Sequence, residues 1–470
     1  MVIKPHGYAI WERLRDELDR RIKRTGAKNA YFPLLIPQSF LSKEAEHVDG
    51  FAKECAVVTH HRLRAKPGGS PGELEPDPEA KLEEPYVIRP TSETIIWHMF
   101  CKWIQSYREL PLVINQWANV VRWEMRTRPF LRTAEFLWQE GHTAHASAAE
   151  ADEKAKEMID LYANVAESIL AIPVLKGCKS PSERFAGADE TYTIEAMMQN
   201  GWALQAGTSH FLGQSFAKAF DVTYKSETGS DELVWATSWG VTTRLVGALI
   251  MTHSDDTGLV LPPSVAPVQV VIVLIFKTDE QLKLVSEFAD SVAARLREAN
   301  VTVEIDNRPN IRPGAKFFEW ERKGVPLRME IGPKDAAKTS VFAVRRIGGQ
   351  KVSIPVDEMF EAATRKVLDS IQDDLLAAAR LRLERRTRSV DSYEVMKTEL
   401  VASSGSVSME DAGFFLVPWK CNSENEQKIK ADTKATLRCY PVDSQHEVAG
   451  KRCFFSGEPA THMAIFARAY

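Results

Sequence analysis

An arginine-rich segment between two apolar runs is the feature that most constrains the fold. The stretch from Arg122 to Arg132 holds four arginines and one glutamate, with apolar and aromatic residues on both sides. This pattern predicts two strands joined by a basic loop. Guanidinium groups match phosphate oxygens two at a time, so arginines that emerge from buried strands could hold a polyphosphate. A solvated basic hairpin is the alternative, but Arg122 follows two valines, and a half-buried charge needs a partner.

Three other segments combine polar residues with apolar surroundings. Trp239–Leu249 predicts an apolar helix whose single charge, Arg244, suggests a nearby anion, although a simply packed helix has the same pattern. Arg89–Thr94 predicts the end of a strand followed by a helix capped by Thr91 or Ser92. Gln205–His210 predicts a turn with several hydrogen-bonding side chains. None of these segments specifies a function alone.

The length of the chain predicts about three domains, because 470 residues exceed the usual ~100 to 200 per domain. The pair Pro262 and Pro263 is the strongest boundary signal. The order strand, helix, strand that follows, with a β-branched run at 269–276, predicts a compact α/β domain. A helix is expected from about Gln372 to Lys397. The predicted domains are residues 1–262, 263–372 and 373–470.

The N-terminal region contains three simpler patterns. Tyr8–Arg24 has apolar residues at helical spacing and predicts an amphipathic helix. Tyr31–Ile36 lies between prolines and predicts a strand at an edge or interface. Pro67–Glu84, with four prolines, three glycines and six acids, predicts a solvated loop.

The charge balance excludes a uniformly basic nucleic-acid binder, because 60 Lys and Arg face 64 Asp and Glu. Pro67–Glu84 alone contributes one positive and six negative charges, whereas Asp306–Lys334 has seven positive against four negative. Local basic patches therefore remain available for a nucleic acid. The longest apolar run is too short to span a membrane, no secretory signal opens the chain, and six scattered cysteines suit a reducing cytoplasm.

Taken in order, these segments resemble the class II aminoacyl-tRNA synthetases, and their residues are similar to those of the prolyl-tRNA synthetase branch. Tyr31–Pro37 resembles class motif 1, Val121–Phe136 motif 2 and Trp239–Arg244 motif 3. The strings similar to the prolyl branch in particular are Arg89–Thr94, Phe136–His142, Ala206–His210, Gly258–Pro263 and Phe466–Tyr470. The resemblance covers nearly the whole chain.

The resemblance implies a mixed α/β (α+β) fold: an antiparallel-sheet catalytic domain, an α/β anticodon-binding domain and a small α+β C-terminal domain. It implies ATP-dependent conversion of L-proline to prolyl-adenylate and transfer of the prolyl group to the 3′ terminal adenosine of tRNA(Pro). The implied cofactors are ATP and Mg²⁺, and the implied assembly is a homodimer through motif 1. A catalytically silent, tRNA-binding or regulatory paralogue is the alternative, which the retained motif arginines Arg122, Arg132 and Arg244 disfavour.

The family pattern also implies roles for individual residues. Arg122 and Arg244 are the expected catalytic residues. Arg122 is expected to bind the α-phosphate, and Arg244 the γ-phosphate and the adenine. The expected ATP contacts are Arg122, Glu124, Arg132, Phe136, Gln205, Thr208, Thr242 and Arg244. The expected proline contacts are Thr91, Glu93, Arg122, Trp138, Glu140, Phe185, Thr208 and His210. The expected anticodon contacts are Phe317, Glu321, Arg328 and Lys334. The stretch from 140 to 238 is too short for the family's editing insertion.

Two groups of His, Cys and Glu residues resemble metal sites but lack a complete set of ligands. His142 and His145 form an HxxH pair beside Glu140 without a third ligand, so His142 is predicted to support the pocket by hydrogen bonding. Many relatives hold zinc near the C-terminus. Here the matching region keeps Cys421, Cys439 and Cys453 but has Asn425 or Glu426 and Ser456 in place of thiolates, although Glu426 or His446 could substitute. Zinc is therefore not expected, and no residue is assigned as a metal ligand.

Overall fold

The computed structural model describes residues 1–41, 55–402 and 413–470, and a long mixed sheet dominates it. Within these residues the sheet has eleven strands, and only its two terminal pairs are parallel. In spatial order the strands are β1 (Lys28–Asn29), β7 (Leu112–Val121), β8 (Glu135–His145), β14 (Trp235–Thr242), β11 (Ala203–Gly213), β10 (Glu190–Met197), β9 (Val174–Cys178), β22 (Thr436–Pro441), β23 (His462–Ala467), β21 (Phe414–Trp419) and β20 (Thr387–Ser389). The predicted pair of strands around the basic loop is confirmed as β7 and β8.

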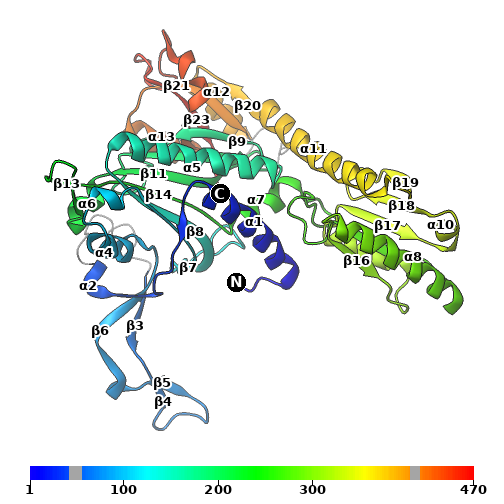
Figure 1. The fold of residues 1–470 in the computed structure, drawn as a ribbon. Coiled ribbons are helices and arrows are strands. Elements are labelled where there is room, and N and C mark those ends of the chain that lie inside the picture. The colour runs from blue at the N-terminus through cyan, green and yellow to red at the C-terminus, as the bar shows by residue number, and fades with distance from the viewer. Residues whose placement is uncertain (42–54, 403–412) are drawn as a thin grey trace.

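Helices cover the faces of the first seven strands, which we call the core. Long helices α1 (Pro5–Arg24) and α5 (Ala148–Ser168) lie against the sheet, with α7 (Arg244–His253) nearby (Figure 1). The amphipathic helix predicted at the N-terminus is confirmed, since α1 buries Leu14, Leu18 and Ile22 in the same cluster as Trp239 of β14. A second cluster lies around α4 (Glu93–Trp103) and α6 (Ser215–Phe220). Apolar packing on the sheet thereby fixes the strands that carry the cavity described below.

A slender extension projects from the core (Figure 1). It consists of a three-stranded sheet, β2 (Leu35–Pro37), β6 (Lys81–Ile88) and β3 (Ala56–His60), and of a two-stranded one, β4 (Leu63–Ala65) and β5 (Leu74–Pro76). The strand predicted at 31–36 therefore starts only at Leu35. The prediction of a loop at 67–84 is wrong for its second half, because cross-strand ion pairs such as Arg64–Glu75 hold the acidic residues in a hairpin. Minor elements elsewhere are α2 (Gln38–Leu41), β12 (Thr223–Lys225), β13 (Asp231–Leu233) and 3₁₀ turns at Pro78–Ala80, Tyr107–Glu109 and Val442–Val448.

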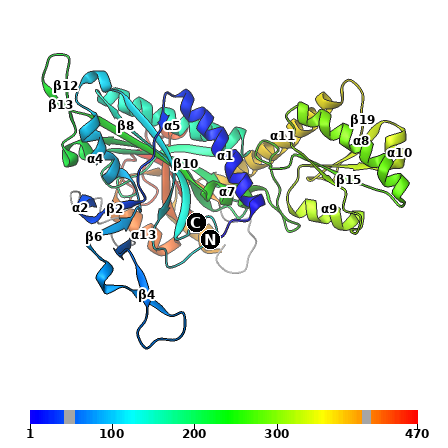
Figure 2. The same ribbon diagram turned by 60° about the horizontal axis from the view of Figure 1, so that its bottom comes forward.

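The second unit is an α/β domain with its own sheet, as the sequence predicts. The strand order is β16 (Val303–Asp306), β15 (Val270–Leu274), β17 (Leu327–Ile331), β18 (Ser340–Arg345) and β19 (Lys351–Pro355). The strand β15 is buried along its whole length and pairs in parallel with both neighbours. The helices are α8 (Asp279–Glu298), α9 (Pro313–Arg322) and α10 (Pro333–Ala337). This unit stands beside the core, joined to it along α11 (Phe360–Arg386) (Figure 2).

The C-terminal unit continues the sheet of the core. It contains β20 to β23, α12 (Tyr393–Ala402) and α13 (Ser423–Thr433). The single helix predicted at 372–397 is wrong, because α11 ends at Arg386 and a strand separates it from α12. Pairing of Tyr440 in β22 with Cys178 in β9 joins the unit to the core. In the described ranges, no helix is long and apolar enough to cross a membrane.

Candidate active site

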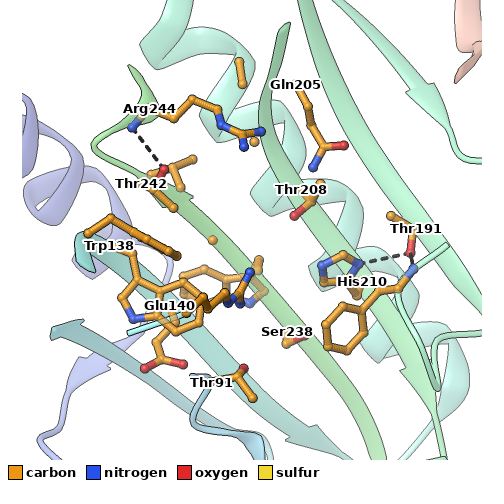
Figure 3. Close-up of a pocket in the computed structure, with 18 of the residues that line it drawn as sticks. Thr91, Trp138, Glu140, Thr191, Gln205, Thr208, His210, Ser238, Thr242 and Arg244 are labelled. Carbon is orange, nitrogen blue, oxygen red and sulfur yellow. Dashed lines mark hydrogen bonds between the residues drawn. The ribbon is translucent and has the colours of Figure 1, made fainter. Parts of the chain in front are cut away.

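One cavity of about 530 Å³ opens over the central strands of the core (Figure 3). Every residue that the sequence assigned to ATP or proline lines it. These residues are Thr91, Glu93, Arg122, Glu124, Arg132, Phe136, Trp138, Glu140, Phe185, Gln205, Thr208, His210, Thr242 and Arg244. Arg244 and Gln205 lie at one end, with Thr91 and Glu140 at the other (Figure 3). The structure thus gathers residues that are up to about 150 positions apart, since long-range strand pairing brings them onto one surface.

Two segments that line this cavity differ from their predicted secondary structure. Trp239–Thr242 belongs to β14, and the helix begins only at Arg244. Gln205–His210 is the middle of β11 rather than a turn. Polar side chains in both strands face a cavity instead of an apolar core, so hydropathy does not reveal the strands. The strand β11 contains a bulge, because Ile194 of β10 pairs with Gly207 whereas Glu195 pairs with Gln205. The bulge places Gln205 on the cavity face together with Thr208 and His210.

Glycines in the strands beneath the cavity allow close packing. A Cβ on Gly141 would lie 2.1 Å from the ring of Trp239, and one on Gly240 would lie 2.8 Å from the carbonyl oxygen of Gln139. Real Cβ atoms do not approach so closely, so a side chain at either position would force the two strands apart. The floor therefore depends on glycine at both positions.

Glu140 is the centre of a buried hydrogen-bond network at one end of the cavity. Its carboxylate accepts from Ser92 Oγ at 2.6 Å and from Gln116 Nε2 at 2.7 Å, and it bonds His142 Nε2 at 3.0 Å. Ser92 does occupy the N-cap position of α4, but its hydroxyl bonds Glu140 instead of capping the helix. The nearby Glu93 accepts from Thr91. This end of the cavity thus presents two carboxylates, which suit a cationic amine.

An aromatic wall closes another side. The rings of Phe185 and His210 stack with their centres 4.5 Å apart. Thr191 Oγ1 bonds His210 Nδ1 at 3.0 Å and accepts from the backbone N–H of Phe185 at 3.1 Å. Sequence reasoning missed Thr191 and Gln116 and considered Ser92 only as a helix cap, because each acts through a partner on another element. For Thr191 and Gln116, a polar residue within a strand was the only signal available.

Guanidinium groups line the rest of the cavity, with Arg122 beside Trp138 and Arg244 at the end away from Glu140 (Figure 3). Arg122 Nε donates to Pro90 O at 3.0 Å, and its guanidinium lies over the rings of Phe136 at 5.5 Å and Trp138 at 5.8 Å. Arg244 donates to Leu131 O at 3.2 Å. Burial lowers the pKa of Arg244, and the positive charge of Arg132 lowers it further. A polyanion between these arginines would relieve the repulsion between their charges, so the part of the cavity that they line is suited to phosphate groups.

The predicted anticodon residues lie in the second unit. The guanidinium of Arg328 lies 4.1 Å from the ring centre of Phe317, and it also contacts Glu321 at 3.4 Å. Lys334 is exposed on the short α10, beyond the end of β17. Three of the four residues therefore form one cluster of aromatic, cationic and carboxylate groups.

The candidate metal ligands bond other partners. His145 bonds Thr143 Oγ1 at 2.9 Å while His142 bonds Glu140, so the HxxH pair is split between two networks. Glu426 accepts from Ser180 at 3.0 Å and from Ser182. Among the residues that the structure describes, no three His, Cys, Asp or Glu side chains form a group that could hold a metal ion. The absence of zinc stays a prediction.

Comparisons with known proteins agree along the whole chain. A model of the tRNA synthetase class II core domain (G, H, P, S and T) matches residues 77–253, an anticodon binding domain matches 269–366, and a prolyl-tRNA synthetase C-terminal domain matches 407–470. The large antiparallel sheet with its cavity is therefore the core of a class II aminoacyl-tRNA synthetase.

Individual relatives narrow this class. A proline–tRNA ligase of Porphyromonas gingivalis is 54% identical over 100% of this chain and 92% of its own, and one of Bacteroides fragilis is 55% identical over 100% and 93%. The crystal structure of prolyl-tRNA synthetase from Cryptosporidium parvum with halofuginone and AMPPNP matches with a TM-score of 0.89 at 40% identity, covering 100% of this chain and 90% of the other. The chain belongs to the proline–tRNA ligase family.

Proposed function

We propose that this cavity performs both steps of proline–tRNA ligation. In the first step, ATP and L-proline form prolyl-adenylate and pyrophosphate; in the second, the prolyl group passes to the 3′ terminal adenosine of tRNA(Pro). The observation that carries the proposal is the polarity of the cavity: Glu140 lies at one end and Arg244 at the other (Figure 3), while Arg122 lies beside Trp138 and the carbonyl oxygen of Pro90. Such an arrangement can hold an amino acid and a nucleoside triphosphate with the carboxylate of one facing the α-phosphate of the other.

The part of the cavity lined by Arg122, Arg132 and Arg244 is the proposed ATP site. Arg122 binds the α-phosphate, where negative charge grows as the adenylate forms, and Arg244 binds the γ-phosphate and faces the adenine. Glu124 and Phe136 position the adenine. The remaining contacts come from Arg132, Gln205, Thr208 and Thr242. Support comes from the Cryptosporidium parvum relative, which was solved with AMPPNP.

Magnesium is proposed to enter as part of the ATP substrate. Mg²⁺ usually binds through substrate phosphates with one or two carboxylates and several waters. Glu124 lines the cavity and offers such a carboxylate. The ion would neutralise charge on the pyrophosphate.

The carboxylate end is the proposed proline site. Glu140 and Glu93 attract the secondary ammonium, while Phe185 and Trp138 offer aromatic surface to the ring. Thr91, Thr208 and His210 complete the contacts. A smaller amino acid such as alanine loses only ~1 to 3 kcal/mol for each missing methylene, so the shape of the cavity gives limited selectivity.

The chemistry needs no general base, because the proline carboxylate is already ionised near neutral pH. The barrier falls when Glu140 holds the ammonium of proline and Arg122 holds the α-phosphate, so that the proline carboxylate and the α-phosphate lie in line, and when the arginines stabilise the charge that develops. Fixed side chains do this at little cost, since the network around Glu140 is already hydrogen-bonded.

The other parts of the proposal concern the partners. Phe317, Glu321, Arg328 and Lys334 would read the anticodon, because unstacked bases need aromatic and hydrogen-bonding side chains. Residues 31–37 would form the interface of a homodimer, and the enzyme would work in the cytoplasm. The domain limits proposed are 1–262, 263–372 and 373–470.

Proline-dependent exchange of pyrophosphate into ATP tests the proposal. The folded chain is expected to catalyse it, and Arg122→Ala is expected to lower the rate at least ~10²-fold by removing charge stabilisation. Arg126→Ala is the matched control, since Arg126 is exposed in the same loop and outside the cavity. A folded chain without exchange, or an active Arg122→Ala, would refute the proposal.

A further inference from the structure

The segment that joins β9 to β10 forms one wall of the cavity. Its residues Lys179, Glu183, Arg184 and Phe185 line the cavity. On the core side it is held by β10, where the carbonyl oxygen of Thr191 accepts from the backbone N–H of Lys179 at 2.8 Å. The hydroxyl of Thr191 holds the backbone of Phe185 at the other end. Between these two points Arg184 bonds Glu190 of β10 at 2.7 Å, whereas the hydroxyls of Ser180 and Ser182 bond the C-terminal unit.

The C-terminal unit supports the first part of the segment. Glu426, on α13, accepts hydrogen bonds from Ser180 at 3.0 Å and from Ser182, both near the start of the segment. Glu426 is only 8% exposed. The ammonium of Lys179 also donates to the carbonyl oxygen of Arg438 in β22, at 2.7 Å. Two elements of the C-terminal unit therefore touch the wall from behind.

The setting of Glu426 is costly for a carboxylate. Burial raises its pKa, and the two serine hydroxyls offset only part of that effect. Its Oε1 is buried without a hydrogen-bond partner among the described residues. A buried acid held by two serines of a cavity wall contributes little to stability. Its contacts point to a role in ordering that wall.

We propose that Glu426 is a positioning residue for proline: by holding Ser180 and Ser182 it fixes the segment that presses Phe185 against His210. The inference rests on the proposed function, because it takes Phe185 and His210 as contacts of proline. The C-terminal unit then contributes to amino-acid binding without touching the amino acid.

The proposal predicts a selective effect. His210 lies on one side of the cavity and Arg244 and Thr242 on another (Figure 3), and Phe185 stacks on His210. Arg244 and Thr242 come from α7 and β14, where Arg244 bonds Leu131 and Thr242 rather than the segment. Loosening the segment should therefore weaken the binding of proline and leave ATP unaffected. A residue that only stabilised the fold would change both.

Steady-state kinetics of the exchange reaction test this. Glu426→Ala is expected to raise KM for proline about tenfold, since small misplacements of a binding wall have effects of this size or larger. KM for ATP should stay within about twofold, because ATP contacts are untouched. Glu426→Gln keeps an oxygen that accepts from the serines and should behave as the wild type. Glu424→Ala is the matched control: it removes an exposed carboxylate from the same first turn of α13.

A double-mutant cycle identifies the path. Ser180→Ala combined with Ser182→Ala should raise KM for proline as Glu426→Ala does, and adding Glu426→Ala should change it little further. The serine variant also serves if Glu426→Ala does not fold. Equal rises in both KM values, or a Glu426→Ala variant that matches Glu424→Ala, would overturn the inference alone. A folded wild type without exchange would overturn the proposed function instead.

Discussion

The two peripheral units are attached to the core in opposite ways. The C-terminal unit shares its sheet with the core and has a buried ionic cluster at the junction. Lys179 donates to Glu195 at 2.7 Å, and Arg438 of β22 donates to the other oxygen of Glu195 at 2.9 Å. Burial opposes ionisation of Glu195, but the charges of Arg438 and Lys179 outweigh it and hold its pKa below the usual value.

The second unit keeps a separate sheet and meets the core through polar contacts at its rim and through a small apolar cluster that includes Val260 and Ile371. Arg346, which is only 6% exposed, bonds Asp255 of the core at 2.6 Å, and Asp255 is 49% exposed. The same guanidinium donates to the carbonyl oxygen of Glu321, on the helix proposed to read the anticodon. Rim contacts of this kind are weak and allow a unit to shift, whereas a shared sheet does not. The C-terminal unit is therefore built to hold the active site, and the second unit to adjust to a partner.

The largest effect is expected from breaking the buried cluster. Arg438→Met leaves Glu195 buried with one cation, so the free energy of unfolding should fall by about 3–5 kcal/mol. Unfolding in urea, followed by circular dichroism, measures this. Lys428→Met, which removes an exposed cation from α13 of the same unit, should change it by less than about 0.5 kcal/mol. A loss below about 1 kcal/mol in Arg438→Met would mean that the shared sheet alone holds the junction.

The next largest effect is expected from pH, which should change the stability of the core more than that of the second unit. His145 and His253 lie in the core, and burial lowers the pKa of each to about 4, with help from Lys154 and Arg382 respectively. The unfolded chain, with a pKa near 6.5, then binds more protons between these values. Stability of the core should therefore fall as pH drops from about 6.5 to about 4, by as much as ~3 kcal/mol for each histidine.

The second unit lacks this weakness, because residues 263–372 contain no histidine. Its Asp306 has a pKa well below the usual range; burial opposes this, but Arg308 and Trp320 hold the carboxylate ionised. That contribution is lost only below about pH 4. Hydrogen exchange at pH 7 and pH 5, corrected for intrinsic rates, should show protection falling in peptides of 135–255 but not of 269–366. His145→Gln should reduce the change in the core, and equal losses in both regions would contradict the comparison.

The same contrast explains what sequence reasoning could reach. The α/β second unit follows from a local pattern, since a β-branched run, a helix and another strand lie within some forty residues. The local pattern around Arg122 and Arg244 suggested an anion, but the roles of the predicted cavity residues came from a resemblance of short strings. The strand at Gln205–His210 was missed because its polar side chains resemble a turn. Glu426 was considered only as a possible zinc ligand, and its bonds to Ser180 and Ser182 span 244 or more positions that no local pattern connects.

The smallest effect is expected at the rim of the second unit. Arg346→Met should lower the free energy of unfolding by about 1–2 kcal/mol at low salt, because the buried guanidinium also donates to the carbonyl oxygens of Leu259 and Glu321, while its carboxylate partner is half-exposed. Part of that difference should vanish at 0.5 M salt, where a Debye length of about 4–5 Å screens exposed pairs. The effect of Arg438→Met should hardly change with salt, since its partner Glu195 is fully buried.

Arg380→Met is the control for the rim, because Arg380 pairs with Glu167 between α11 and the core and both side chains are exposed. It should cost about 0.5 kcal/mol or less. Urea unfolding of the three variants at two salt concentrations measures all these differences together. If Arg346→Met proved as destabilising and as insensitive to salt as Arg438→Met, the second unit would be locked to the core as firmly as the C-terminal one. Adjustment of the second unit to tRNA would then have to come from within its own sheet and helices.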